Sequence, residues 1–599
     1  MAQPGVTELK APLPTHQNMS ADLEIKDVAV EASQVISDSG VGSVQPFQEV
    51  GYARSLKRRQ IMMMAFGAGI GTGLWVGTGS ALAKAGPGGI AVSYTIMAWI
   101  VYLMYMSIGE MTAYKPVHGG FTRQAGDYVD PALGFAIGIN FWFNWVMIIP
   151  AEITACISVL HYWETSYKVG IAVWITIFLI IIAFINYWPV KLYGEVEFWF
   201  SFLKCLALVA IIFFMVVMTS GGIKFTGGPI EFRYWRDPGA FVNGIKGIAA
   251  AFVQAGFSFG GGEHIAVMAG EAKNPRETVK RSVRPLFWRM FTFFVVNIWL
   301  VGMCIPYDEP NLINESGTMA SPFVLAVRHS NLYGLAHALN AFILITVISC
   351  GITSAYIASR TLCALSDLNW IHPVFGKKDS QGRPYVAMAV SMVLGGSLCY
   401  LNCNNTAAEV YNWFSSLVGI SGFLQWGTIY WMHIRFRKGL KAQGIPAKSL
   451  PFYDIFAPWS QYIGILVIFL IMAAEFYLAI WPFDAKPSAE NFFATYIAAP
   501  LFVIDYFAYK WWYKTKIVRP EDMDFTEAFH FDEIERRERE EAERNPKPKL
   551  KMRATGTVLE PPQQYGENRR SIVMELADVG HFCEVETNTK VAGMTADSI

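Results

Sequence analysis

Cysteine is scarce in this sequence, and its few cysteines do not pair. The chain of 599 residues has eight, and they lack the spacing of a disulfide framework or a zinc site. Almost all of them lie within apolar runs, at Cys156, Cys205, Cys304, Cys350, Cys363, Cys399, Cys403 and Cys583. We therefore expect neither a disulfide-stapled secreted protein nor a metal site.

An excess of charge and catalytic motifs are lacking as well. Lysine plus arginine number 48 and aspartate plus glutamate number 48, so the formal net charge at pH 7 is zero. This balance gives no argument for a nucleic-acid partner. The sequence contains neither an HExxH metal-ligand pattern nor a GxSxG nucleophile elbow. We expect no enzyme and no bound cofactor.

No apolar core of a cleavable signal peptide is visible in the polar N-terminal stretch. We expect residues 1–55 to be a disordered cytosolic tail. What the chain does have is a series of long, nearly uncharged runs, each long enough to cross a bilayer as a helix. They predict an all-α membrane protein with twelve spans, at about 61–85, 88–113, 133–162, 170–188, 195–219, 243–270, 285–306, 323–363, 385–402, 406–433, 458–481 and 491–513.

Basic residues gather in alternate loops, and this asymmetry predicts the orientation. The segment that follows the tenth run carries Arg435, Arg437, Lys438 and Lys441, whereas the opposite loops hold few such residues. We therefore expect both termini in the cytosol, with residues 56–518 as the membrane domain and 519–599 as a cytosolic tail. Glycosylation sequons at Asn314 and Asn404 fall on the predicted outer face. Their loops are short, and the sequence leaves their occupancy open.

Two of the predicted spans are interrupted by glycine. The first contains Gly67, Gly69, Gly71 and Gly73 within seven residues, and the sixth contains the segment 257–264, which reads FSFGGGEH. Close helix packing is one explanation, because small residues let backbones approach each other. A glycine in a helix interior costs about 1 kcal/mol relative to alanine, and a carboxylate at membrane depth costs at least about 2.5 kcal/mol. A functional break is the interpretation that we favour.

The two interruptions lie five spans apart, as in transporters built from two inverted five-helix repeats whose first helices are broken at the midplane. A break exposes backbone amides at the N-terminus of one half-helix and carbonyls at the C-terminus of the other. Amides suit a carboxylate and carbonyls suit an ammonium group. An α-amino acid carries both groups, so the pattern favours an amino-acid site near residues 67–73 and 257–262.

Ionisable residues inside the runs are candidates for coupling a second ion. They include Glu110, Glu152, Lys204 and Glu263. Any one of them could instead be a core residue whose charge is satisfied. Lys204 lies about ten residues into its run, too deep to reach the interface easily, and a buried amine can exchange a proton. We expect Lys204 to be the main coupling residue.

From about Leu56 to Phe525 the chain resembles the fungal (yeast-type) amino-acid permeases of the amino acid–polyamine–organocation superfamily. The matching motifs include LKRRQIMMMAFGAGIGTG, GEM, VDPALGFAIGINFWFNW, YGEVEFWFSFLK, AGEAKNPRETV, SPFVLAV, ASRTLCAL and EVYNWFSSLVGISGFLQWG. The resemblance implies the LeuT-like fold of twelve transmembrane helices, with two inverted five-helix repeats plus two C-terminal helices. It also implies a multi-pass plasma-membrane permease for amino acids, with the proton as coupling ion.

The resemblance also implies roles for particular residues. The substrate carboxylate would meet amides near Ile70, Gly71, Thr72 and Gly73, the ammonium group would meet carbonyls near Gly69, Phe257 and Gly260, and Phe257 would be an aromatic gate. Ser258 and Phe259 belong to the same segment. Lys204 matches a lysine that replaces a bound sodium ion in some relatives, and Glu152 and Glu263 match acidic positions of the fungal branch.

This chain departs from its relatives at two places that bear on side-chain preference. Many relatives have GTEL in the sixth span, whereas this chain has GGEH, which places His264 beside Glu263. In the eighth span it reads SCGITSAY where relatives often carry an asparagine, so we expect Thr353 and Ser354, with His264, to influence specificity. Carnitine or polyamine transport therefore stays an alternative.

A second alternative is an amino-acid sensor that signals through its tails with little or no transport. The tails could bind ubiquitin-ligase adaptors, or they could have no function of their own. The sequence does not reveal which amino acid is preferred.

Overall fold

The computed structural model describes Met63, Gly67 and the residues from Gly69 to Arg544, apart from 118, 224–226, 265, 267–274, 313–320 and 484–485. The predicted tail 1–55, the Asn314 sequon and the chain beyond Arg544 lie outside the described residues. Contacts divide the chain into two units, Met1–Met523 and Asp524–Ile599. In the second unit, α19 (Thr526–Arg544) is a charged helix in which Glu533 pairs with Arg536 and Arg537.

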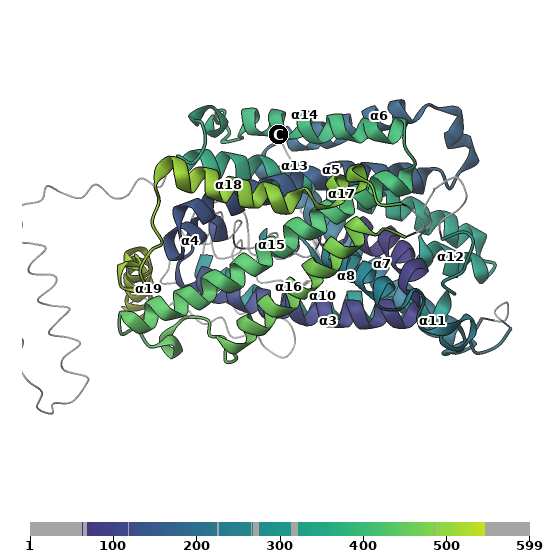
Figure 1. Cartoon of the computed structure of the whole chain (residues 1–599), viewed down its shortest axis with the longest axis horizontal. Helices are drawn as coiled ribbons and strands as arrows, with labels where there is room; N and C mark the ends of the chain where they lie inside the picture. Colours follow the sequence, from purple (N-terminus) through teal and green to yellow (C-terminus); the bar gives the residue numbers. More distant parts are fainter. Residues whose placement is uncertain are drawn as a thin grey trace, which may run out of the picture. The chain divides into compact units, whose positions relative to one another are not determined.

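The regular elements of the described residues are all helical (Figure 1). In the first unit the main helices are η1 (Gly73–Gly77), α3 (Thr78–Tyr114), α4 (Gly120–Tyr128), α5 (Pro131–Leu160), α6 (Ile171–Asn186), α7 (Val190–Thr219), α8 (Gly244–Phe259), α10 (Pro275–Phe291), η5 (Thr292–Val296), α11 (Asn297–Cys304), α12 (Pro322–His329), α13 (Tyr333–Asp367), α14 (Tyr385–Cys399), α15 (Ala407–Ala442), α16 (Trp459–Ile480), α17 (Ala489–Tyr496) and α18 (Ala498–Tyr513). Short 3₁₀ and π turns connect some of them.

Seven helices in the described residues are long and apolar enough to cross a membrane, or eight if the bent pair α17 and α18 forms one span. Two shorter apolar helices, α6 and α8, add to these. The prediction of an all-α membrane protein is thus confirmed. Each of the twelve predicted segments overlaps a helix, while the count of twelve membrane spans stays a prediction.

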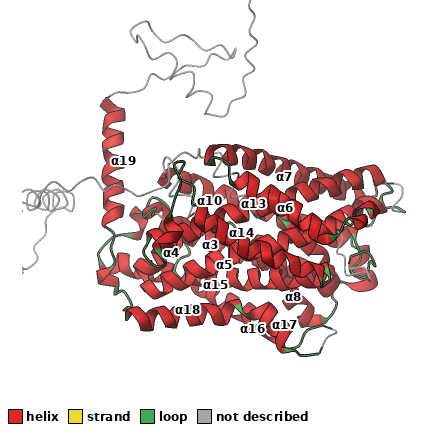
Figure 2. Cartoon of the chain, turned by 90° about the horizontal axis from the view of Figure 1, so that it is seen from above, coloured by secondary structure: helices red, strands yellow, loops and turns green. Residues whose placement is uncertain are grey.

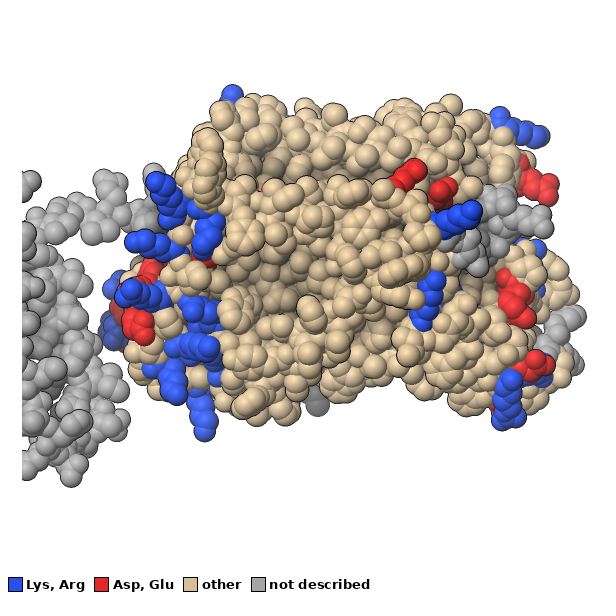
Figure 3. Space-filling model, viewed as in Figure 1, with Lys and Arg blue, Asp and Glu red and all other residues tan. Residues whose placement is uncertain are grey.

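The centre of the bundle is formed by α5, which packs against α13 and α15, while α3 packs against α8. Figure 2 shows α7 on one side of the bundle and α16 and α18 on the opposite side. The outer faces of these helices expose large apolar side chains such as Phe213, Phe469 and Phe507, each more than 60% exposed. Figure 3 shows the same feature as a broad uncharged band between two charged ends. Such a band suits contact with lipid.

Glycine and proline cause the break between the first two predicted segments. The structure joins them in α3, but Gly86 has φ 75° and ψ 171°, which interrupts the helix before Pro87. A Cβ at Gly86 would lie 2.7 Å from the carbonyl oxygen of Ala240. The positive φ and this close approach both require glycine.

The eighth predicted segment, 323–363, needs correction. The structure divides it into α12 and α13, because Asn331 adopts the left-handed conformation (φ 59°) and ends the first helix. Asparagine tolerates this conformation better than most residues. The polar run from His329 to Asn331 is the signal that would have predicted the break.

Candidate functional site

Each glycine-rich segment contains a helix end among the described residues. The helix α8 ends at Phe259, Gly260 is extended (ψ 157°), and Gly261 has φ 98°, which only glycine adopts easily. In the first segment the amide of Ile70 donates to the carbonyl of Gly67 at 3.2 Å in a short turn, and a helix begins at Gly73. Each break therefore places a helix end inside the bundle.

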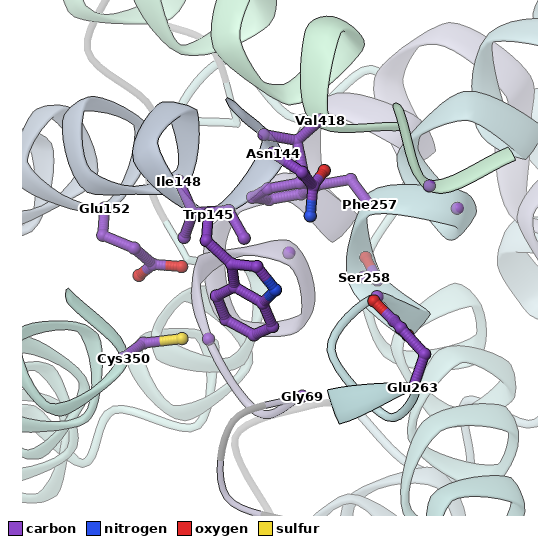
Figure 4. Close-up of a pocket in the computed structure, with 15 residues that line it drawn as sticks. Gly69, Asn144, Trp145, Ile148, Glu152, Phe257, Ser258, Glu263, Cys350 and Val418 are labelled. Carbon is purple, nitrogen blue, oxygen red and sulfur yellow. The ribbon is translucent and has the colours of Figure 1, made fainter. Parts of the chain in front are cut away.

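A cavity lies between the two breaks (Figure 4). Its walls come from the first glycine-rich segment, α5, the end of α8, α13 and α15. The lining residues are Gly69, Gly71, Gly73, Asn144, Trp145, Ile148, Glu152, Gly256, Phe257, Ser258, Gly260, Glu263, Cys350, Val418 and Gly422. Figure 4 shows Glu152 and Cys350 on one side, Ser258 and Glu263 on the other, and the Trp145 ring between them.

Two glycines are required by the close approach of the first segment to its neighbours. A Cβ at Gly73 would lie 2.7 Å from the Cα of Ser258, and one at Gly71 would lie 2.6 Å from Glu152 Oε1. Both distances are shorter than normal van der Waals contact, so the backbone itself forms the cavity wall at these positions. Close packing, one of the two explanations open at the sequence level, is therefore present, and the functional interpretation of the break stays a prediction.

The two carboxyl groups of the cavity are buried and only half satisfied. Glu152 Oε1 accepts hydrogen bonds from Thr72, at 3.0 Å from Oγ1 and 3.4 Å from the amide. Glu263 Oε1 accepts from the amide of Gly261 at 3.2 Å. The Oε2 atoms of both residues have no hydrogen-bond partner among the described residues. A buried polar atom without a partner is costly, so these oxygens indicate where a donor group of a ligand would bind.

Lys204 lies behind the first glycine-rich segment rather than in the cavity lining. Its side chain is 1% exposed, and Nζ donates to the carbonyl oxygen of Gly67 at 3.1 Å. Glu197 Oε1 lies 4.0 Å from this nitrogen, and both Glu197 oxygens accept from Ser349 Oγ, at 3.0 and 3.2 Å. Sequence reasoning missed Glu197. The sequence did contain a signal for Glu197: it lies seven residues before Lys204, and this spacing places both residues on one face of α7, two helical turns apart.

The residues proposed for specificity lie outside the cavity lining. His264 is buried, with its ring edge-on to Trp145 at 5.8 Å and Nδ1 against the carbonyl of Gly261. Thr353 Oγ1 accepts from the hydroxyl of Tyr193 at 3.3 Å, and Ser354 Oγ donates to the carbonyl of Cys350 at 2.8 Å. Any effect of these three residues on a ligand would be indirect, and their role in specificity stays a prediction.

The other predicted substrate-binding residues lie in the lining or pack directly behind it. Phe259 stacks on Phe294 with ring centroids 4.8 Å apart, and Tyr94 lies within hydrogen-bond distance of Ser258, at 3.0 Å. Phe257 lies edge-on to Tyr411 at 5.9 Å. Ile70 and Thr72 are buried next to the lining glycines. The structure therefore gathers the predicted substrate-binding residues around one cavity.

Several lining residues were not predicted from the sequence. They come from helices that are apolar on most faces: Asn144, Trp145 and Ile148 on α5, Cys350 on α13, and Val418 and Gly422 on α15. Hydrophobic periodicity does not separate a cavity face from a protein face in such helices. Asn144 offered the strongest signal, because it is a polar amide within an apolar run. Its Oδ1 has no hydrogen-bond partner among the described residues.

Glu110 belongs to a separate network at the far end of α3. Its Oε2 accepts from Arg437 Nη2 at 2.6 Å and from the amide of Asp454 at 2.8 Å, and His433 Nε2 lies 3.5 Å from Oε1. Gln461 donates to Asp454 at 3.0 Å. This network joins α3 to α15 and α16 and does not reach the cavity. Within the described residues, no cluster of three histidine, cysteine or acidic side chains could hold a metal ion.

Comparisons with known proteins identify the family of this chain. Residues 60–520 match the family model described as amino acid permease. The chain is similar to amino-acid permease GAP5 of Candida albicans (37% identity, covering 81% of this chain and 78% of the relative) and to general amino-acid permease GAP1 of Saccharomyces cerevisiae (36%, covering 76% of each). It is also similar to cationic amino acid transporter 1 of Schizosaccharomyces pombe (36%, covering 79% of this chain and 81% of the relative).

Similar solved structures include Mhp1, a nucleobase-cation-symport-1 family transporter, and the manganese transporter of Eremococcus coleocola. Their TM-scores are 0.43 and 0.46, with 13% and 11% identity. Each comparison covers 76% of this chain, together with 100% of the Mhp1 chain and 93% of the manganese transporter.

Proposed function

This chain belongs to the amino acid permease family, and on that premise we propose that it imports amino acids across the plasma membrane by proton symport. The observation that carries the proposal is the cavity between two interrupted helices. Its walls combine backbone ends with two half-satisfied carboxyl groups. Both termini are placed in the cytosol in this proposal.

The cavity offers complementary partners for the two charged groups of an amino acid. The long helix of η1 and α3 begins at Gly73, so its positive end and the amides near it suit the substrate carboxylate. The C-terminal end of α8 and the open oxygens of Glu152 and Glu263 suit the ammonium group. The carboxylate and the ammonium group are common to every amino acid. These parts of the cavity would therefore bind the core of the substrate and not its side chain.

Proton coupling in this proposal uses Lys204 and Glu152, which contact opposite ends of the first glycine-rich segment. Lys204 bonds to Gly67, and Glu152 bonds to Thr72. A change in the charge of either group alters what the backbone of this segment contacts. Alternating access then links proton binding to the position of the segment.

The test is uptake of labelled amino acids by permease-deficient cells that express the chain. Saturable uptake that a protonophore abolishes supports the proposal. Uptake that ignores both external pH and the protonophore would refute the coupling, and binding without uptake would indicate a sensor. Carnitine and polyamines belong in the competition panel, since uptake of these alone would refute amino acids as the substrate.

A further inference from the structure

Glu197 and Lys204 form a buried acid–amine pair on one face of α7. Each side chain is 1% exposed, and the amine nitrogen lies 4.0 Å from Glu197 Oε1. Ser349 on α13 donates to both carboxyl oxygens, which fixes the carboxyl group against α13. The pair is thus held between α7, α13 and the first glycine-rich segment.

The backbone of the first segment packs directly on this pair. A Cβ at Gly67 would lie 1.9 Å from Ser201 Oγ and 3.3 Å from Glu197 Oε1, so no side chain fits there. Gly67 precedes the cavity residue Gly69 by two positions, and Ser349 immediately precedes the cavity residue Cys350. The pair therefore contacts residues next to two of the cavity walls, the first glycine-rich segment and α13.

A buried ammonium group depends on its counter-charge. Among the described residues, Lys204 Nζ donates to one carbonyl oxygen, that of Gly67, and Glu197 carries the carboxyl group that lies within 4.0 Å. Taking a partner from a buried ion pair leaves an uncompensated charge, which the remaining group avoids by changing its protonation. Other titratable groups that interact electrostatically with this pair are Glu152 on α5, Cys350 on α13, and Tyr193 and Cys205 on α7.

We propose that Glu197 is a positioning residue that holds Lys204 in its protonated form and so sets the pH range of transport. This inference rests on the proposed proton symport. While Glu197 is charged, the amine keeps its proton and its bond to Gly67. Without that charge, the buried ammonium group loses the carboxylate that compensates it, so its protonated form and its bond to the first segment become less stable.

The experiment compares Glu197→Gln with the wild type in proton-driven uptake between pH 4.5 and 8, normalised to the amount at the cell surface. We expect the midpoint of the pH profile to move toward acid by about one unit, a tenfold change in proton concentration. Glu197→Asp keeps a carboxylate and should bring the profile part of the way back to that of the wild type. Glu195→Gln is the matched control, because Glu195 lies two residues earlier on α7, is only partly buried and is not within 4.0 Å of Lys204.

A second arm tests whether Glu197 acts through Lys204. In a Lys204→Met background, Glu197→Gln should cause no additional change in the pH profile, as expected when two residues form one unit. If Glu197→Gln does not reach the surface, the purified Glu197→Gln protein in liposomes provides the same measurement, and an unshifted profile there overturns the inference.

The outcomes separate this inference from the proposed function. If uptake by the wild type is insensitive to protonophore, both the proposed proton coupling and the role of Glu197 are refuted. If uptake by the wild type is proton-driven and the pH profile of Glu197→Gln coincides with that of the wild type, only the role of Glu197 is refuted. Loss of activity without a shift in the midpoint indicates a purely structural pair and also overturns the inference.

Discussion

A methyl group added at Gly73 would clash with the backbone of α8, which cannot move aside as a flexible side chain could. The new Cβ would lie 2.7 Å from the Cα of Ser258 and 2.8 Å from its Oγ. Relief requires the first glycine-rich segment and the end of α8 to separate by several tenths of an ångström. Because this junction forms the cavity wall, Gly73→Ala should change the site before it changes the rest of the fold.

The expected cost follows from overpacking a tight contact, which is roughly 1–3 kcal/mol. If this cost falls on the substrate-bound state, kcat/KM for uptake should drop about 5- to 150-fold, since 1.4 kcal/mol is a factor of ten. The assay is initial uptake over a range of substrate concentrations, divided by surface abundance. Gly427→Ala on α15 is the control, because its Cβ would have a nearest neighbour at 3.9 Å.

Uptake by Gly73→Ala within twofold of the wild type would refute the reasoning, since the contact would then be one that the protein easily relaxes. Equal losses in Gly73→Ala and Gly427→Ala would also refute it. Loss of surface protein without loss of activity per molecule would place Gly73 in folding and not in the site.

Three further substitutions test other parts of the arrangement. Lys204→Met should lower uptake or remove its pH dependence at unchanged surface abundance, and a wild-type pH profile would contradict its coupling role. Glu152→Gln keeps the volume of the side chain but removes the charge beside Thr72. Substrate affinity, measured by a binding assay on purified protein, should fall at least about tenfold, as expected when a hydrogen bond to a charged group is lost. Arg437→Ala leaves the buried Glu110 without its main counter-charge and should destabilise the protein by about 3–5 kcal/mol, measured as thermal inactivation, whereas the neighbouring Lys438→Ala should have little effect.

The sequence predicted the two breaks because glycine density is a local property. Each glycine that the structure requires, such as Gly71 or Gly261, lies within a cluster that can be seen in a single segment. The helix positions were predictable for a similar reason, since length and hydropathy are summed along one run. The break at Asn331 was missed because a polar turn of three residues barely changes such a sum, and the bend between α17 and α18, inside the predicted segment 491–513, was missed as well.

The cavity walls were harder to predict because they depend on which helix faces meet. Val418 on α15 and Cys350 on α13 are apolar or nearly so, and nothing in their own segments distinguishes them from core residues. Glu197 was missed for another reason. It lies near the predicted start of its span, where a carboxylate reads as an interfacial residue, but α7 begins at Val190 and carries Glu197 inside the bundle.

The charges around the cavity bear on which substrate groups it could accept. Among the described lining residues, the acidic ones are Glu152 and Glu263, and Lys204 lies behind the wall, bonded to Gly67. A substrate carboxylate therefore meets no lysine or arginine among these residues, and backbone amides at the start of a helix become its natural partner. The same charges oppose a second carboxylate on the substrate. Aspartate and glutamate should consequently compete for uptake more weakly than neutral amino acids of similar size, and equal competition would mean that a cation from elsewhere reaches the site.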